Sequence, residues 1–196
     1  MGVTGLFGGA FDPPHNGHVA LARRAQERFA LDLLVVIPTG VAPHKRIETP
    51  AETRLRLAEA AFADLHGAEV SRWEIDRGEP SYTLETTRWA RERYGELLFL
   101  VGADQFARLD TWYRPDDVLE LARLAVATRP GYPQEELERV CGTLRDPGRV
   151  EFFEIEPWPV SSTEIRDRVR RGEAIDDVVP PGVARLIAEL GLYGAD

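Results

Sequence analysis

Residues 8–18 read Gly8-Gly9-Ala10-Phe11-Asp12-Pro13-Pro14-His15-Asn16-Gly17-His18, and the rest of the chain is organised around this stretch. An apolar run at residues 3–7 leads into it, and a segment with helical periodicity follows it. Paired glycines let a backbone turn sharply and approach a ligand closely. A strand, a glycine turn and a helix N-terminus in this order are typical of phosphate sites in parallel α/β sheets, because free amides and the helix dipole face the ligand.

The bulk composition limits the class of protein. The chain has 196 residues, so we expect a single domain over residues 1–196 with a sizeable core. A net charge of −9 argues against nucleic acid as a main partner. The single Cys141 excludes an internal disulfide framework and a cysteine-rich zinc site. No apolar run reaches membrane-spanning length and no signal peptide is evident, so we expect a cytoplasmic protein without a membrane partner.

Apolar runs alternate with helical patterns along the chain. The runs that predict strands lie at residues 3–8, 33–37, 68–73, 96–101, 124–128 and 150–155. We expect Asn16 to cap the first helix, a polar loop at residues 74–81, and Ser81 to cap the helix that follows it. The alternation predicts a Rossmann-like, doubly wound parallel sheet of about five to six strands with helices on both faces. Ligands of such sheets bind beyond the carboxyl ends of the strands, where the polar loops should meet.

His15 and His18 are three residues apart, so they share one face of the first helical turn. A metal site is a weak interpretation, because no third ligand is near and the His-Glu-x-x-His pattern is absent. A buried structural role also fits poorly, because the prolines and the glycine around the histidines indicate an open turn. Two imidazoles at a helix N-terminus best suit an anion whose charge grows during phosphoryl transfer.

Lys45 is the only lysine among the 24 Lys and Arg residues of the chain. It follows His44 in the loop after the second predicted strand. Chance is the alternative explanation, but a loop position in the second βα connection favours a functional role for this compact point charge.

Two motifs carry a resemblance to a known family. The stretch at residues 8–18 resembles the signature of the nucleotidyltransferase superfamily with a His-x-x-His (HxGH) motif. Members transfer a nucleoside monophosphate from a triphosphate to a phosphate acceptor and release pyrophosphate. Ser161-Ser162-Thr163-Glu164-Ile165-Arg166 is similar to the second motif of that superfamily. Alone it would be an ordinary helix capped by Ser161 or Ser162, but its hydroxyls and Arg166 also suit the β- and γ-phosphates.

Further stretches resemble the bacterial nicotinate-nucleotide adenylyltransferase family. They are Ala42-Pro43-His44-Lys45, Pro80-Ser81-Tyr82-Thr83-Leu84-Glu85-Thr86, and Gly102-Ala103-Asp104 followed by Leu109-Asp110-Thr111-Trp112. The resemblance implies that Trp112 stacks on the pyridine ring and that backbone amides of Tyr82 and Thr83 meet the nicotinate carboxylate. Ala10 stands where the family usually has Thr, and Glu85 stands where Asp is more usual, so these two positions bear on acceptor preference.

The resemblance implies a reaction in which ATP and nicotinate mononucleotide give deamido-NAD and pyrophosphate. The implied catalytic residues are His15, His18, Lys45 and Arg166. The implied ATP-binding residues are Gly8, Gly9, Ala10, Phe11, Gly102, Asp104, Ser162 and Thr163. We expect Mg²⁺ to enter on the substrate phosphates, with no metal ligands from the protein.

Three alternatives stay open at this point. The acceptor could be nicotinamide mononucleotide or phosphopantetheine within the same superfamily. From another class, the chain could be a non-catalytic nucleotide-binding regulator. The intact set His15, His18, Lys45 and Arg166 disfavours the regulator, because a sensor need not retain all four groups.

Overall fold

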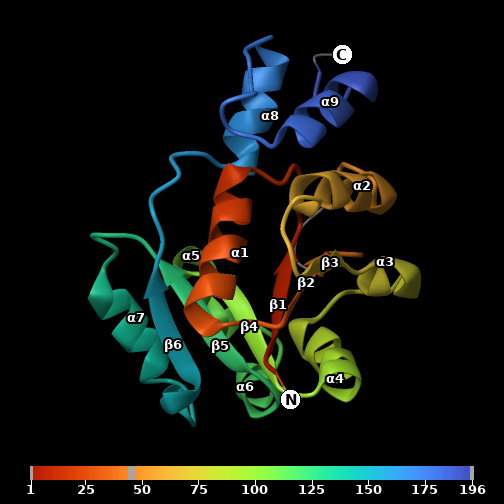
Figure 1. Cartoon of the computed structure of the whole chain (residues 1–196). Coiled ribbons are helices and arrows are strands. Elements are labelled where there is room, and N and C mark those ends of the chain that lie inside the picture. Colours follow the sequence, from red (N-terminus) through yellow and green to blue (C-terminus); the bar gives the residue numbers. More distant parts are fainter. Residues whose placement is uncertain (1, 44–46, 195–196) are drawn as a thin grey trace.

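The computed structural model describes residues 2–43 and 47–194. Within these ranges six strands form one parallel sheet in the order β3-β2-β1-β4-β5-β6 (Figure 1). The strands are β1 (Thr4–Gly9), β2 (Leu33–Pro38), β3 (Ala68–Val70), β4 (Leu97–Gly102), β5 (Arg123–Thr128) and β6 (Val150–Glu154). The predicted Rossmann-like sheet is confirmed. Strand order reverses between β1 and β4, and ligands of doubly wound sheets bind at this position.

The central strands are apolar because both of their faces are covered. In β2, the residues Leu34, Val35, Val36 and Ile37 have no exposed surface. β1 lies between β2 and β4, with Thr4 aligned to Leu33 on one side and to Leu97 on the other. The register places the carboxyl ends of β1, β2 and β4 at one edge of the sheet.

Helices cover both faces of the sheet. One core cluster packs α1 (Asn16–Phe29), α2 (Ala51–Phe62), α8 (Ser162–Arg170) and α9 (Pro181–Glu189) on the first face. The other cluster packs α4 (Thr83–Tyr94), α5 (Ala103–Phe106), α6 (Pro115–Leu121) and α7 (Gln134–Cys141) on the second face. Short helices α3 (Trp73–Arg77), η1 (Leu109–Thr111) and η2 (Pro147–Arg149) complete the elements of the described ranges. No helix in residues 2–43 or 47–194 is long and apolar enough to cross a membrane.

Three local predictions are wrong. Residues 73–77 form α3, where we expected a strand to end at residue 73 and a polar loop to follow, because a buried Glu74 and a stacked Trp73–Trp89 pair, with centroids 4.8 Å apart, anchor this segment. α4 begins at Thr83 with Tyr82 in the cap position, and Ser81 lies one residue earlier, where its amide donates to the Val41 carbonyl at 2.8 Å.

The third wrong prediction concerns the start of α1. The cap position of α1 is His15, one residue before the predicted Asn16. The Asn16 side chain donates to the Asp177 carbonyl at 3.2 Å and so joins the C-terminal part of the chain.

Candidate active site

The loop between β1 and α1 brings the two histidines together. Their ring centroids are 3.8 Å apart, and the backbone amide of His15 donates to His18 Nδ1 at 3.2 Å. A neutral His18 that accepts at Nδ1 carries its proton on Nε2, so Nε2 remains a donor for a ligand oxygen. His15 Nδ1 is buried and has no hydrogen-bond partner among the described residues. Unsatisfied polar atoms of this kind are typical of sites that await a ligand.

Both histidines favour the neutral form. Burial lowers the pKa of His15 to about 4. Burial also lowers the pKa of His18 well below its ordinary value, and the neighbouring His15 lowers it further. Near pH 7 the pair therefore offers N–H donors without holding full positive charges. An anion bound beside the rings would favour their protonated forms.

The buried Phe11 side chain packs against the inner side of this loop. Its ring is 2% exposed and packs edge-on against Phe7 and His18, with centroids 5.4 and 5.3 Å away. Its φ of 49° lies in the left-handed region, which turns the chain back toward α1. A Cβ on Gly9 would lie 3.0 Å from the Phe11 ring, so only glycine fits there without displacement. Phe11 can thus reach a nucleotide through its backbone alone.

The second predicted motif lies against the first. In Figure 1, α8 lies beside the N-terminal end of α1, although the two helices are far apart in sequence. Ser162 Oγ donates to the Pro13 carbonyl at 2.9 Å, and Arg166 Nη1 donates to the Asp12 carbonyl at 2.7 Å. Ser161 caps α8 by accepting from the Glu164 amide at 3.1 Å. The N-terminus of α8, with Thr163 in its first turn, therefore faces the same loop as the histidines.

Asp12 is also held from the C-terminal end of the chain. The Tyr193 hydroxyl donates to Asp12 Oδ1 at 2.7 Å. Burial and this hydrogen bond raise the pKa of Tyr193. Asp12 thus has its carbonyl bound by Arg166 and its carboxylate bound by Tyr193, and both contacts restrain the loop before His15.

Arg54 is a structural residue of the site that the sequence analysis did not single out. It is 1% exposed and donates to three backbone carbonyls. These are the carbonyls of Ala10 at 2.9 Å, Gly40 at 3.1 Å and Thr49 at 3.1 Å. Burial lowers the pKa of Arg54, but an arginine remains protonated. The sequence did contain a signal, because Arg54 shares a helical face with Ala58 and an arginine on an apolar stripe is unusual.

Glu74 fixes the opposite side of Gly40. Its carboxylate accepts from the Gly40 amide at 3.3 Å and from Thr86 Oγ1 at 2.6 Å. Burial raises the pKa of Glu74, and these hydrogen bonds act against that rise. A Cβ on Gly40 would lie 2.2 Å from the Glu74 carbonyl oxygen, so this approach requires glycine. The predicted catalytic Lys45 lies outside the described residues, but the loop that leads to it is held at Gly40 from both sides.

A second group of predicted residues lies on the other face of the sheet. Tyr82, just before α4, contacts Tyr113 with ring centroids 5.3 Å apart. Trp112 is half-buried and packs edge-on against Phe99 of β4 at 5.8 Å. A Cβ on Gly8 would lie 3.4 Å from the same Phe99 ring, so Phe99 separates the start of the histidine loop from Trp112.

Three more of the predicted residues surround this region. Thr83 is the first residue of α4, where helix amides lack intrahelical acceptors. Gly102 ends β4, and Asp104 is exposed in the first turn of α5. The carboxyl edge of the sheet thus carries the histidine loop on one face and the tryptophan region on the other.

Comparison with known proteins shows which family the chain belongs to. Residues 6–168 match the cytidylyltransferase-like family profile. A probable nicotinate-nucleotide adenylyltransferase of Rubrobacter xylanophilus is 38% identical, and the match covers 98% of this chain and 92% of that protein. The chain belongs to the nicotinate-nucleotide adenylyltransferase family. A family member from Gemmatimonas aurantiaca is 42% identical, with 96% of this chain and 91% of the relative covered.

Solved structures support the family fold. The nicotinic acid mononucleotide adenylyltransferase of Plasmodium falciparum complexed with NaAD superposes with a TM-score of 0.78. That match covers 98% of both chains at 15% identity, so it concerns the fold of the nicotinate-nucleotide adenylyltransferase family rather than individual side chains. Within residues 2–43 and 47–194, no three His, Cys, Asp or Glu side chains come together as a metal site requires.

Proposed function

We propose that this protein transfers AMP from ATP to nicotinate mononucleotide, giving deamido-NAD and pyrophosphate in NAD biosynthesis. The observation that carries the proposal is the contact between its two motifs. Arg166 and Ser162 bind the backbone of the loop that precedes His15, so a helix N-terminus, an arginine and two imidazoles surround one place. Such a concentration of N–H donors suits a triphosphate. The names of the homologues support the choice of substrates.

In the proposed reaction an acceptor phosphate oxygen attacks the α-phosphorus of ATP. A new P–O bond forms, the bond from the α-phosphorus to the bridging oxygen breaks, and pyrophosphate leaves with the electron pair. The acceptor oxygen is already nucleophilic, so the protein needs no covalent intermediate. Catalysis is then positioning together with stabilisation of the charge that develops on the phosphate oxygens.

The histidine loop supplies the donor side in this proposal. His18 donates from Nε2 to an α-phosphate oxygen, because the His15 amide occupies its Nδ1. His15 binds the neighbouring phosphate region, and amides of Gly8, Gly9, Ala10 and Phe11 line the turn. Arg166 and the first-turn amides at Ser162 and Thr163 hold the leaving pyrophosphate. Lys45 bridges the phosphates of donor and acceptor, and Gly102 and Asp104 border the nucleotide.

The acceptor side would use the other face of the sheet. Trp112 stacks on the pyridine ring, and the amides of Tyr82 and Thr83 at the start of α4 bind the nicotinate carboxylate. Bare N–H groups and a helix dipole suit a carboxylate, whereas an amide would also need an acceptor. This chemistry favours nicotinate over nicotinamide mononucleotide.

We propose that Mg²⁺ enters on the phosphates of ATP. The donor set around the histidine loop consists of N–H and hydroxyl groups, which suit phosphate oxygens rather than a cation. Bound there, the ion would neutralise phosphate charge during transfer. We also propose that the protein acts in the cytoplasm, consistent with its one free cysteine, Cys141.

A pyrophosphate-release assay tests the function. ATP is supplied with nicotinate mononucleotide, nicotinamide mononucleotide or phosphopantetheine, in separate reactions at equal acceptor concentration. We expect the highest kcat/KM with nicotinate mononucleotide. Faster turnover of another acceptor would reject the substrate assignment, and ATP binding without pyrophosphate release from any acceptor would identify a non-catalytic nucleotide-binding protein.

A further inference from the structure

Three arginines surround a cavity at the edge of the sheet opposite the proposed active site. The cavity has a volume of about 210 Å³ and is lined by Arg91, Glu96, Leu97, Arg123 and Arg149. Leu97 and Arg123 are the first residues of β4 and β5, and Arg149 directly precedes β6. The cavity therefore lies at the amino ends of three neighbouring strands, whereas the histidine loop follows the carboxyl end of β1.

The two edges are well separated. β4 runs from Leu97 at the cavity to Gly102 at the carboxyl edge, and five steps of a parallel strand span about 17 Å. A ligand in the cavity would not compete for the place where we put the substrates.

The three guanidinium groups have different partners. Arg123 forms ion pairs with Glu96, at 3.3 Å, and with Glu151. Arg91 donates to the Gly95 carbonyl at 3.0 Å and caps the end of α4. Arg149 has a buried Nε without a hydrogen-bond partner among the residues that the structure describes. Neither Arg91 nor Arg149 forms an ion pair with any residue in the described ranges, so two positive charges remain uncompensated at the cavity.

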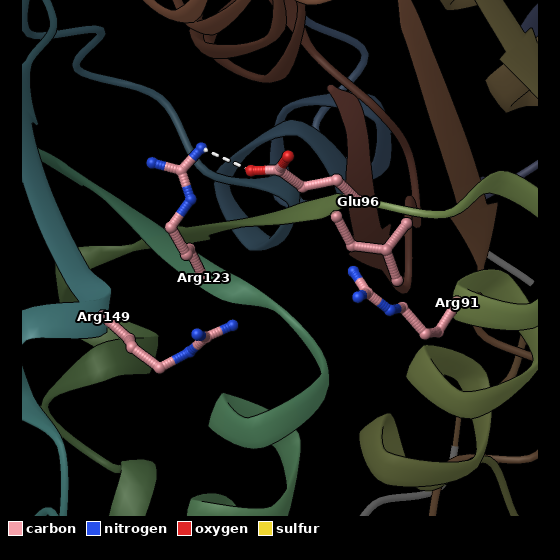
Figure 2. Close-up of a pocket in the computed structure, with 5 residues that line it drawn as sticks. Arg91, Glu96, Arg123 and Arg149 are labelled. Carbon is pink, nitrogen blue, oxygen red and sulfur yellow. Dashed lines mark hydrogen bonds and ion pairs between the residues drawn. The ribbon is translucent and has the colours of Figure 1, made fainter. Parts of the chain in front are cut away.

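The orientation of these side chains suits a ligand between them. Figure 2 shows Arg123 turned toward Glu96, whereas the guanidinium groups of Arg91 and Arg149 point from opposite sides into the gap. A buried N–H without an acceptor costs free energy, and an anion that accepts from it would remove that cost. The arrangement is unusual in a chain with a net charge of −9.

We propose that this cavity binds a small, doubly charged oxyanion of the phosphate class. Guanidinium forks match the oxygens of phosphate bidentately. Two forks that approach from opposite sides and each bind two oxygens need at least three oxygens on the ligand, and a tetrahedral oxyanion provides them whereas a carboxylate has only two. One water takes roughly 30 Å³ of liquid volume, so the cavity admits a phosphate with a few waters but no dinucleotide.

Nuclear magnetic resonance of the ¹⁵N-labelled full chain tests the proposal. Inorganic phosphate and glycerol 3-phosphate are titrated separately at constant ionic strength, with chloride as the compensating anion. We expect saturable shifts of the backbone amides of Arg91, Leu97, Arg123 and Arg149. Shifts with both ligands indicate recognition of a phosphate head group, and shifts with inorganic phosphate alone indicate a site for the free ion.

Substitutions then assign the binding to Arg91 and Arg149, the two lining arginines without an ion pair in the described ranges. Arg149→Gln and Arg91→Gln should each weaken phosphate binding about tenfold, as expected for the loss of a charge-assisted hydrogen bond. Arg91 is on a different element, so it keeps the test valid if Arg149→Gln does not fold. Arg123 is left unchanged because it holds two glutamates. Arg24→Gln, on the exposed side of α1, removes the same charge elsewhere and should leave the affinity unchanged.

Two results would overturn the proposal. One is that the cavity amides move no further with phosphate than with chloride at equal ionic strength. The other is that the folded Arg149→Gln or Arg91→Gln variant keeps the phosphate affinity of the Arg24→Gln control. Phosphate-induced shifts that are confined to the loop at residues 8–18 would also overturn the proposal. They would show phosphate binding at the proposed triphosphate site and none at the cavity.

Discussion

Replacing Arg54 with methionine tests how firmly the core of the protein holds its candidate active site. The change keeps an unbranched apolar stem but shortens the side chain, and it removes the donors to three carbonyls, those of Ala10, Gly40 and Thr49. Unsatisfied buried acceptors cost about 1 to 3 kcal/mol each. Removing a buried charge recovers several kcal/mol of desolvation free energy, so we expect a net loss of about 2 to 4 kcal/mol. Urea denaturation followed by circular dichroism measures this loss.

The same helix offers a matched control. Arg56 is exposed two positions further along α2, so Arg56→Met should change the free energy of unfolding by less than about 0.5 kcal/mol. Adenylyl transfer gives a second measurement, because freeing Ala10 and Gly40 loosens two loops of the proposed site. If Arg54→Met and Arg56→Met unfold at the same urea concentration, the three carbonyls find other donors and Arg54 does not stabilise the loops of the candidate site.

Four further predictions concern the histidine loop and the acceptor region. His18→Ala should lower kcat at least about a hundredfold with an unchanged circular dichroism spectrum, the range for losing a positioned donor, and near-normal turnover would exclude that role. Trp112→Ala should raise the KM for nicotinate mononucleotide more than the KM for ATP, whereas equal increases would indicate a structural role. Because the pKa of His15 is lowered to about 4, the unfolded chain binds its proton first, and His15 should lower the free energy of unfolding from about pH 6.5 to pH 4 by at most about 1.4 kcal/mol per pH unit. The pKa of His18 is lowered too, so His18 adds to this fall. His15→Gln should make that slope shallower in urea titrations at several pH values, leaving the contribution of His18, and an unchanged slope would contradict the assignment. Gly17→Ala places a Cβ 3.0 Å from His15 Nδ1 and should reduce kcat. Alanine has a better helix propensity than glycine, so the urea midpoint should stay unchanged or rise. Full activity would show that the His15 ring is free to move.

The sheet could be predicted from sequence because its signals are local and repeated. A buried parallel strand must be apolar on both faces, so runs such as residues 33–37 and 97–101 indicate strands directly. α3 was missed because its cause is not local. Glu74 is buried through Gly40 and Thr86, which lie 34 and 12 positions away, and no pattern within residues 73–77 reports those partners.

The candidate site also combines features that local sequence motifs predict with features that depend on distant contacts. The glycines, histidines and Arg166 belong to short motifs, and the contact of Arg166 with the Asp12 carbonyl brings the two motifs together as expected. The sequence could not show that Arg166 and Ser162 bind the backbone of the histidine loop, because carbonyl acceptors leave no trace in residue identity. An arginine on the apolar stripe of α2 was the one signal of Arg54, and its three acceptors could not be read from the sequence because all of them are backbone oxygens.

The hydrogen bonds of Arg166 and Tyr193 to Asp12 join the two ends of the chain, so they depend on the order of synthesis. Arg166 and Tyr193 follow Asp12 by 154 and 181 positions, so the histidine loop is synthesised long before the groups that hold it. At roughly 5 to 20 residues per second, the ribosome needs about 10 to 35 s to cover that distance. A nascent chain that has released all six strands still lacks α8 and Tyr193. Prematurely terminated chains would therefore carry an assembled sheet with an unrestrained loop, and nucleotide binding would be the last property the protein acquires.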